Sequence, residues 1–295
     1  MIEVSLRPEI ESRLASQATA LEMPLGSYVG QLIESSADRA PDQDVNRLYL
    51  DLLRCSLTNT LYSVEPDVDD ESQVQYVSDF IRHYIEGTAI SMCPRGRFDN
   101  IESCVADVVK NNIPGDLIET GVWRGGAAIF MRALLKLHKV PDRIVWVADS
   151  FEGLPEPDAA LYPLEAKVHH GKVMEKVYNH FAASLEEVQG NFRAYGMLDG
   201  QVRFLKGWFK DTLPVAPIGA LAIVRLDGDY YESTRDGLTN LFDKLSVGGY
   251  VIVDDYGEDM WTYCRKAVDD FRRERGIEDP MIRVDSKCYY WQRTR

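Results

Sequence analysis

The chain has 295 residues, of which 45% are hydrophobic, enough for one large core and a smaller attached unit. Its 47 acidic and 33 basic side chains give a net charge of −14, which disfavours general binding to nucleic acids or anionic membranes. No apolar run is long enough to span a bilayer, and the first residues lack the basic start and apolar core of a signal peptide.

Residues 1–40 predict a small separate unit. "IEVSL" alternates apolar and polar residues as a strand does, Pro8 opens one predicted helix, and Pro24 opens a second. A strand and two helices of this length resemble a ribbon-helix-helix unit, in which strands of two chains pair. Because the segment carries more acidic than basic side chains, we expect it to make a homo-oligomer rather than to bind DNA.

The rest of the chain, residues 46–295, predicts a single larger domain that opens with an amphipathic helix at 46–63. From residue 116 onward, apolar strands alternate with helical patterns near 125–138, 178–195, 233–245 and 261–275. The predicted strands are 116–119, 143–148, 202–205, 220–226 and 249–253, with weaker ones at 281–284 and 288–291. This order predicts an α/β fold with a doubly wound, mostly parallel, seven-stranded sheet. The two late strands look like a hairpin, so we expect one of them to run antiparallel.

A glycine turn follows the first predicted strand, in "DLIETGVWRGGAAIF". Gly121 allows the backbone to turn sharply where ligands bind in open parallel sheets, beyond the carboxyl ends of the strands. The glycine spacing G-x-x-x-G-G differs from the G-x-G-x-x-G of dinucleotide-binding proteins, which disfavours an NAD-dependent enzyme.

Two acids stand at the ends of consecutive predicted strands. Glu119 is wrong for a phosphate but suits an ammonium group, and Asp149 can accept two hydrogen bonds from a ribose diol. An ammonium and a ribose without a phosphate describe S-adenosylmethionine as the cofactor. We include Ser150, which follows Asp149 directly, among the candidate cofactor-binding residues. In the alternative interpretation the two acids only cap helices.

Gly207 and Trp208 follow the third predicted strand, in "LKGWFKDTLP". The indole could cover one face of an adenine by stacking. A tryptophan in a small local core explains the same pattern equally well.

Four carboxylates follow two further strands: Asp227 and Asp229 in "RLDGDYYEST", and Asp254 and Asp255 in "VIVDDYG". In a doubly wound sheet these strands are neighbours, so Asp227, Asp254 and Asp255 should converge at one edge. Carboxylates crowded together repel one another unless a cation lies between them. Oxygen ligands without histidine or cysteine suit a hard cation, and we expect Mg²⁺. Arg225 could pair with one of these acids.

Three smaller signals surround these motifs. Ser233 and Asp236 have the spacing of a helix capping box. Residues 155–177 form a long irregular segment of the kind that often makes a lid. His169 and His170 lie within it, and we expect both of them to face the solvent.

The motifs "DLIETGVWRGG", "VADSFEGLP", "LKGWFKDTLP", "RLDGDYYEST" and "VIVDDYG" resemble the macrocin- and mycinamicin-type (TylF-like) sugar O-methyltransferases. The resemblance covers residues 46–295. It implies a class I, Rossmann-like methyltransferase domain that uses S-adenosylmethionine and magnesium to methylate deoxysugar hydroxyls in antibiotic biosynthesis. The segment at 155–177 corresponds to one that closes over the acceptor.

The resemblance also implies roles for particular residues. Asp227, Asp254 and Asp255 would be the metal ligands, and Asp229 the general base that takes the hydroxyl proton. Alternatively, Asp229 only shapes the turn and water takes the proton. Thr58 would reach the methionine part of the cofactor, although its hydroxyl could equally well close the end of its helix.

The sequence therefore predicts an S-adenosylmethionine- and magnesium-dependent O-methyltransferase acting on a sugar hydroxyl of a glycosylated natural product. One alternative changes the acceptor to a catechol or another phenol, because a catechol chelates magnesium as a vicinal diol does. Another is a DNA-binding regulator with a cofactor-sensing domain, which a salt-dependent gel shift would detect. The five cysteines are scattered, odd in number and without a CxxC pair, so we expect reduced thiols in a cytoplasmic protein.

Overall fold

The computed structural model of the chain describes residues 15, 19, 41–61, 81–171, 180–257 and 262–295. It divides the chain into two units, Met1–Leu52 and Leu53–Arg295. The ribbon-helix-helix unit predicted at 1–40 lies outside the described residues, apart from Ala15 and Thr19, and therefore stays a prediction. The last part of the predicted lid segment lies outside them as well.

The described part of the chain alternates helices and strands from residue 95 onward. The longer helices are α3 (Pro41–Leu57), α5 (Arg95–Lys110), α6 (Gly126–Leu137), α7 (Pro163–His169), α9 (Leu185–Ala194), α11 (Tyr231–Leu241) and α12 (Thr262–Arg275). Shorter turns of helix are η1 (Ile81–Ile85), α10 (Phe209–Thr212), η3 (Leu213–Val215) and η4 (Phe242–Lys244). The strands are β1 (Asp116–Thr120), β2 (Val145–Asp149), β3 (Val202–Lys206), β4 (Leu221–Leu226), β5 (Leu245–Val253), β6 (Ile282–Arg283) and β7 (Tyr289–Gln292).

The strands form one seven-stranded sheet in the order β3-β2-β1-β4-β5-β7-β6. The first five strands in this order pair in parallel, whereas β7 pairs antiparallel with β5 and β6. This confirms the predicted doubly wound, mostly parallel sheet with a late antiparallel hairpin. Strand β4 is buried along its whole length, which fits a central strand covered by helices on both faces.

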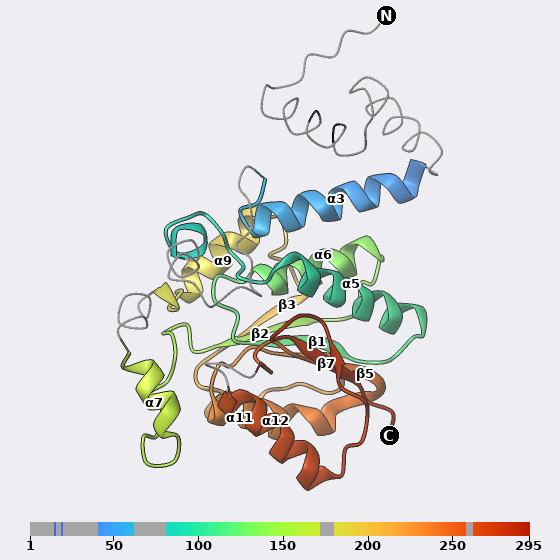
Figure 1. Cartoon of the computed structure of the whole chain (residues 1–295). Helices are drawn as coiled ribbons and strands as arrows, with labels where there is room; N and C mark the ends of the chain where they lie inside the picture. Colours follow the sequence, from blue (N-terminus) through green and yellow to red (C-terminus); the bar gives the residue numbers. More distant parts are fainter. Residues whose placement is uncertain (1–14, 16–18, 20–40, 62–80, 172–179, 258–261) are drawn as a thin grey trace, which may run out of the picture. The chain divides into compact units, whose positions relative to one another are not determined.

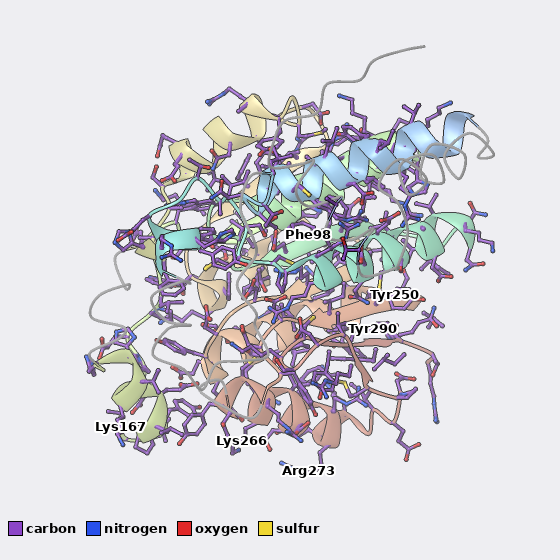
Figure 2. All side chains as sticks on the ribbon, turned by 45° about the horizontal axis from the view of Figure 1, so that its top comes forward. Phe98, Lys167, Tyr250, Lys266, Arg273 and Tyr290 are labelled. Atoms are coloured by element: carbon purple, nitrogen blue, oxygen red, sulfur yellow. The ribbon has the colours of Figure 1, made fainter. Side chains whose placement is uncertain are left out.

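Helices cover both faces of the sheet (Figure 1): α5 and α6 lie on one face, and α11 and α12 on the other. Apolar side chains of β1, β4 and β5 pack with Leu238, Leu241, Val268 and Phe271 of α11 and α12 in one core. On the hairpin side, Figure 2 shows Tyr250 of β5 beside Tyr290 of β7, with 6.1 Å between their ring centroids. Within the described residues, every helix is too short or too polar to cross a membrane. All five cysteines are present as free thiols.

Several helices differ from the sequence-based expectation: α3 spans Pro41–Leu57 rather than 46–63, and α7 forms within the segment predicted as irregular. Helix α5 was not predicted, although Phe98, Ile101, Val105 and Val108 lie at helical spacing along its buried face. Helix α9 begins later than the predicted helix at 178–195, because the Ser184 hydroxyl accepts a hydrogen bond from the Glu187 backbone N–H and caps it.

The register of the central strands sets up the functional edge. Glu119 of β1 lies directly opposite Arg225 of β4, and Leu226 of β4 lies opposite Val253 of β5. Asp227 and Asp254, the residues that follow these last two, therefore leave the sheet side by side. The prediction that these two acids converge is confirmed, because the carboxyl ends of parallel strands meet at one edge of the sheet.

Candidate functional site

A cavity of about 620 Å³ lies beyond the carboxyl ends of the central strands. Residues from the loops after β1, β2, β3 and β4 line it together with the start of α11 and the segment that leads into α7. Its predicted lining residues are Gly121, Asp149, Ser150, Trp208, Asp227 and Asp229. Those that the sequence did not single out include Met92, Trp123, Glu156, Tyr162, Phe181, Phe209, Lys210, Tyr231, Glu232 and Arg235.

Three of the four predicted strand-end acids form a compact cluster. One carboxylate oxygen from each of Asp227, Asp254 and Asp255 lies within 4.8 Å of the other two. Asp254 and Asp255 are buried, while Asp227 is partly exposed and also lines the cavity. The donor set consists only of oxygen, and its spacing suits a hard divalent cation.

Two buried arginines partly compensate these carboxylates, and the suggestion that Arg225 pairs with one of the acids is confirmed. Arg225 Nη1 bonds Glu119 Oε1 at 2.6 Å and Asp227 Oδ2 at 2.8 Å, and its Nη2 bonds Asp254. Arg97 of α5 bonds Asp254 from the other side and holds Asp285 at 2.6 Å. Both oxygens of Asp254 are thus engaged by guanidinium groups. Apart from Arg225 and Asp227, the partners lie far apart in the sequence, so local spacing did not predict the contribution of Arg97.

Two arginines do not balance all of the acids at this edge. Burial, followed by repulsion from Asp229 and Asp227, raises the pKa of Asp255 well above its ordinary value. Burial and repulsion from Asp254 raise the pKa of Asp227 to about 6 even though Arg225 opposes the shift. Negative charge therefore remains in excess beside Asp255, where a bound divalent cation would be stabilised.

Asp229 extends this acidic edge into the cavity. Its backbone is left-handed, with φ of 59°, and its N–H points toward Asp255 Oδ2 at 3.3 Å. Aspartate and asparagine tolerate this conformation better than most residues. Burial and the charges of Asp227 and Asp254 raise the pKa of the Asp229 carboxyl well above its usual range, which makes its carboxylate a stronger base.

Glu119 is not among the residues that line the cavity. It is 2% exposed, and one of its oxygens accepts the hydrogen bond from Arg225. The other oxygen, Oε2, is buried without a hydrogen-bond partner among the described residues, although the backbone N–H of Ala128 helps to stabilise the carboxylate. Burial raises the pKa of Glu119 to about 8 although Arg225 opposes the shift, and a cationic ligand nearby would restore the charged form.

Asp149 and Ser150 line the cavity, and their hydrogen bonds also hold the surrounding loops in place. Asp149 accepts hydrogen bonds at 2.7 Å from the backbone N–H groups of Val122 and Phe151, and thereby joins the loops after β1 and β2. A carboxylate has about four acceptor positions, and the Ser150 hydroxyl at 3.4 Å and the backbone N–H of Trp123 also approach this one, so a ligand would compete with these weaker contacts. The Ser150 hydroxyl donates to the Gly153 carbonyl at 2.8 Å and closes its own turn.

The two glycines that were predicted as cofactor contacts have clear packing reasons. A Cβ on Gly121 would lie 1.7 Å from the Asp227 carbonyl oxygen, and its φ is +80°. The close approach of the β1 and β4 ends therefore requires a glycine at this position. The Gly207 N–H continues the β2–β3 pairing by donating to the Asp149 carbonyl at 2.9 Å. Trp208, the next residue, is partly buried and lines the cavity.

Thr58 is not among the residues that line this cavity. It is buried, and its hydroxyl donates to the Arg54 carbonyl at 2.9 Å and lies 2.8 Å from the Thr60 hydroxyl. These are the contacts of a residue that closes the end of its helix, as the alternative interpretation expected.

The predicted capping box at Ser233 and Asp236 is wrong. Helix α11 begins at Tyr231, so both residues lie within its first turns, and both line the cavity. The charged group at the start of the helix is instead Glu165 of α7, which accepts a hydrogen bond from the Tyr231 N–H at 2.7 Å. A carboxylate is favourable at this end of a helix.

The segment that leads into α7 lines one side of the cavity. The Tyr162 ring, just before α7, stacks on Tyr231 with 4.8 Å between centroids. The prediction that His169 faces the solvent is wrong: it is 7% exposed, and its Nδ1 lies 2.7 Å from the Tyr230 hydroxyl. His170 is exposed, as predicted. The length of the segment between β2 and α9 predicted that it would cover part of the site. It did not predict which of its side chains are buried.

Comparison with known proteins places these features in a family. Residues 85–293 match the family model described as macrocin-O-methyltransferase (TylF). The chain is 47% identical to a demethyldecarbamoylnovobiocin O-methyltransferase from Streptomyces niveus, over 90% of this chain and 99% of the relative. It is 42% identical to a mycinamicin III 3''-O-methyltransferase from Micromonospora griseorubida, over 84% of this chain and 96% of the relative.

The fold has a solved counterpart at similar sequence identity. The structure described as the O-methyltransferase NovP is 49% identical and superposes with a TM-score of 0.73, covering 84% of this chain and 99% of that one. A calicheamicin methyltransferase, CalS11, is only 17% identical with a TM-score of 0.52, over 86% of this chain and 93% of that one. This second likeness extends to the fold alone.

Proposed function

Because this chain belongs to the macrocin-O-methyltransferase (TylF) family, we propose that it transfers a methyl group from S-adenosylmethionine to a sugar hydroxyl of a glycosylated natural product, with the help of Mg²⁺. The observation that carries the proposal is the cluster of Asp227, Asp254 and Asp255, from which Asp227 reaches the cavity that Asp229 also lines. A candidate metal ligand and a candidate base thus line the same cavity.

The cofactor fits the residues on the β1 and β2 side of the cavity. The second carboxylate oxygen of Glu119, buried without a hydrogen-bond partner, would accept a bond from the ammonium group. Asp149 would accept hydrogen bonds from the ribose hydroxyls in place of its weaker contacts with Ser150 and Trp123, and the Trp208 ring, also in the lining, would cover the adenine. S-adenosylmethionine, when bound, supplies an electrophilic methyl group. No phosphate has to be accommodated, which agrees with the acids found here.

The metal fits the donor set of Asp227, Asp254 and Asp255, which is all oxygen and carries excess negative charge. Mg²⁺, when bound, supplies a Lewis acid that lowers the pKa of a coordinated hydroxyl. Arg225 and Arg97 hold Asp254 from two sides, so this ligand is fixed before a metal arrives. Such positioning lowers the cost of organising the site when the metal binds.

Asp229 would accept the proton of the acceptor hydroxyl. Its carboxyl group lines the cavity next to the metal ligands, and its raised pKa brings it nearer to that of an activated hydroxyl. Aromatic side chains of the lining, including Trp123 and Tyr162, would exclude water and orient the acceptor. Orientation and proton removal are the two contributions that this chain makes to in-line transfer.

The acceptor class follows from the relatives. Their names give demethyldecarbamoylnovobiocin, mycinamicin III and a 2,3-dimethoxy-rhamnosyl tetracenomycin as the compounds they methylate. The direct test is to incubate the chain with methyl-labelled S-adenosylmethionine, Mg²⁺ and each of these three acceptors. We expect label in at least one glycoside. Label in a simple catechol and in none of the glycosides would favour the phenol alternative instead.

Replacing Glu119 with glutamine is expected to weaken cofactor binding by about tenfold, since a charged partner of the ammonium group becomes neutral. Glutamine has the same shape and can still accept the hydrogen bond from Arg225. The measurement is calorimetric titration with S-adenosylhomocysteine. Unchanged affinity in a variant with wild-type thermal stability would remove Glu119 from the cofactor site.

Replacing Trp208 with leucine is expected to weaken S-adenosylhomocysteine binding by about three- to tenfold, because leucine cannot stack on an adenine. Trp208→Phe is the matched control, since it keeps an aromatic face at the same position. If both variants bind as tightly as the wild type, Trp208 belongs only to a local core.

A further inference from the structure

A second cluster of metal-ligating side chains lies on the α7 side of the cavity. Glu156, His169 and His170 each offer one ligand atom, and these three atoms lie within 4.8 Å of one another. His170 Nε2 is 2.8 Å from Glu156 Oε1, and His169 Nε2 is 3.3 Å from Glu156 Oε2. None of these residues has a part in the function proposed above.

The spacing of the donor atoms suits one small ion. Zinc binds histidine nitrogen and carboxylate oxygen at about 2.0–2.2 Å in tetrahedral geometry, so neighbouring ligand atoms around it lie about 3.3 Å apart. The separation of 3.3 Å between His169 and Glu156 equals this value, whereas the 2.8 Å between His170 and Glu156 is shorter and is also the length of a hydrogen bond. Two histidines and one carboxylate also match the ligand class of zinc sites that keep a fourth position open.

The buried histidine has the surroundings of a metal ligand. The His169 side chain is 6% exposed, and its other ring nitrogen, Nδ1, lies 2.7 Å from the hydroxyl of Tyr230, which is 2% exposed. With Nδ1 donating to that hydroxyl, the lone pair of Nε2 would face Glu156. Outer contacts of this kind set the ring orientation and tautomer of metal-binding histidines. Burial also lowers the pKa of His169, which favours the neutral ring that a metal requires.

We propose that Glu156, His169 and His170 form a second metal site, which binds a zinc-class ion rather than magnesium. The ion would join the two ends of the segment between Glu156 and His170. Glu156 itself lines the cavity, and Tyr230, which holds His169, follows Asp229 directly in the chain. The site would therefore fix α7 against the residue next to the candidate base.

The test is calorimetric titration of Zn²⁺ into the full chain, freed of any histidine tag, in excess Mg²⁺ so that the oxygen-only cluster is occupied. We expect the wild type to bind one Zn²⁺ per chain. His170→Ala should weaken that affinity by at least about tenfold. His170 is exposed, so the variant should fold normally. The control is His180→Ala, which changes another exposed histidine outside the cluster and should bind as the wild type does.

Tyr230→Phe distinguishes a built site from a pair of surface side chains that happens to chelate. It keeps the buried ring but removes the hydroxyl that orients His169, and we expect a loss of affinity of about 10- to 100-fold. With Co²⁺ as the probe, the wild type should show the strong visible absorption of a four- or five-coordinate ion, and Glu156→Gln should lose it. Wild-type Zn²⁺ affinity in either His170→Ala or Tyr230→Phe would overturn the site.

Discussion

Asp255→Asn is expected to lower the rate of methyl transfer by about 10³-fold, because a Lewis-acidic metal contributes several kcal/mol to such a step. Of the three proposed metal ligands, Asp255 is the one that the arginines compensate least. In the described part of the chain neither Arg225 nor Arg97 forms an ion pair with it. Its loss removes negative charge from the metal site without breaking the buried network around Asp254. The measurement is initial rate in chelator-treated buffer before and after Mg²⁺ is added.

The stability of this variant separates a metal role from a structural one. Asp255 is 6% exposed and surrounded by other carboxylates, so a neutral asparagine should leave the thermal stability unchanged or raise it. The matched control is Asp243→Asn, which neutralises an exposed acid paired with Arg275 and should be fully active. Full activity of Asp255→Asn in chelator-treated buffer would show that the metal assignment is wrong.

Asp229→Asn is expected to lower kcat by about 10²- to 10⁴-fold, the usual contribution of a positioned general base. Asparagine is the appropriate replacement here because the residue has a φ of 59°. Asparagine adopts this left-handed conformation nearly as readily as aspartate. The variant therefore removes the base while keeping the turn that carries it.

The kinetic pattern decides the role of Asp229. Loss of the base should lower kcat while the affinities for S-adenosylhomocysteine and Mg²⁺ change little. Asp229→Ala serves as the comparison, since alanine also strains the backbone and should lose stability as well as activity. Unchanged turnover in Asp229→Asn would mean that the side chain only shapes the turn and that water accepts the proton.

Much of the sheet could be predicted because its central strands are continuous apolar runs that end in conspicuous residues. Strand β4 is buried throughout, and Asp227 follows it directly, as Asp254 follows β5. Parallel strands in adjacent positions bring such residues together without further information. The convergence of the three aspartates therefore follows from strand order alone.

Of the two compensating charges, Arg225 could be suggested from its position in the strand before Asp227, but Arg97 could not. Arg97 lies on a helix that was missed, and it reaches Asp254 across 157 positions of sequence. His169 differs from its neighbour His170 only by the side of the α7 end to which it points, yet one is buried and the other exposed. Long-range packing decides both outcomes, and neither hydrophobic periodicity nor local spacing encodes it.

Residues with a left-handed backbone conformation could not be predicted from the sequence either. Trp123 has a φ of 48° and Asp229 one of 59°, although neither is a glycine. Surrounding structure must hold such residues in place, and they often lie at functional sites. Both line the cavity. The motif around Trp123 indicated a turn at Gly121, but the position that carries the unusual conformation could be found only in the structure.

The measurement that tests the account most directly needs no knowledge of the acceptor. Purified protein is titrated calorimetrically with S-adenosylhomocysteine and, separately, with NAD, each in Mg²⁺ and in chelator. The account predicts that the homocysteine compound binds once per chain and that NAD does not bind. If the folded protein binds NAD and does not bind S-adenosylhomocysteine, the proposed cofactor is wrong. Glu119 and Asp149 would then need another explanation.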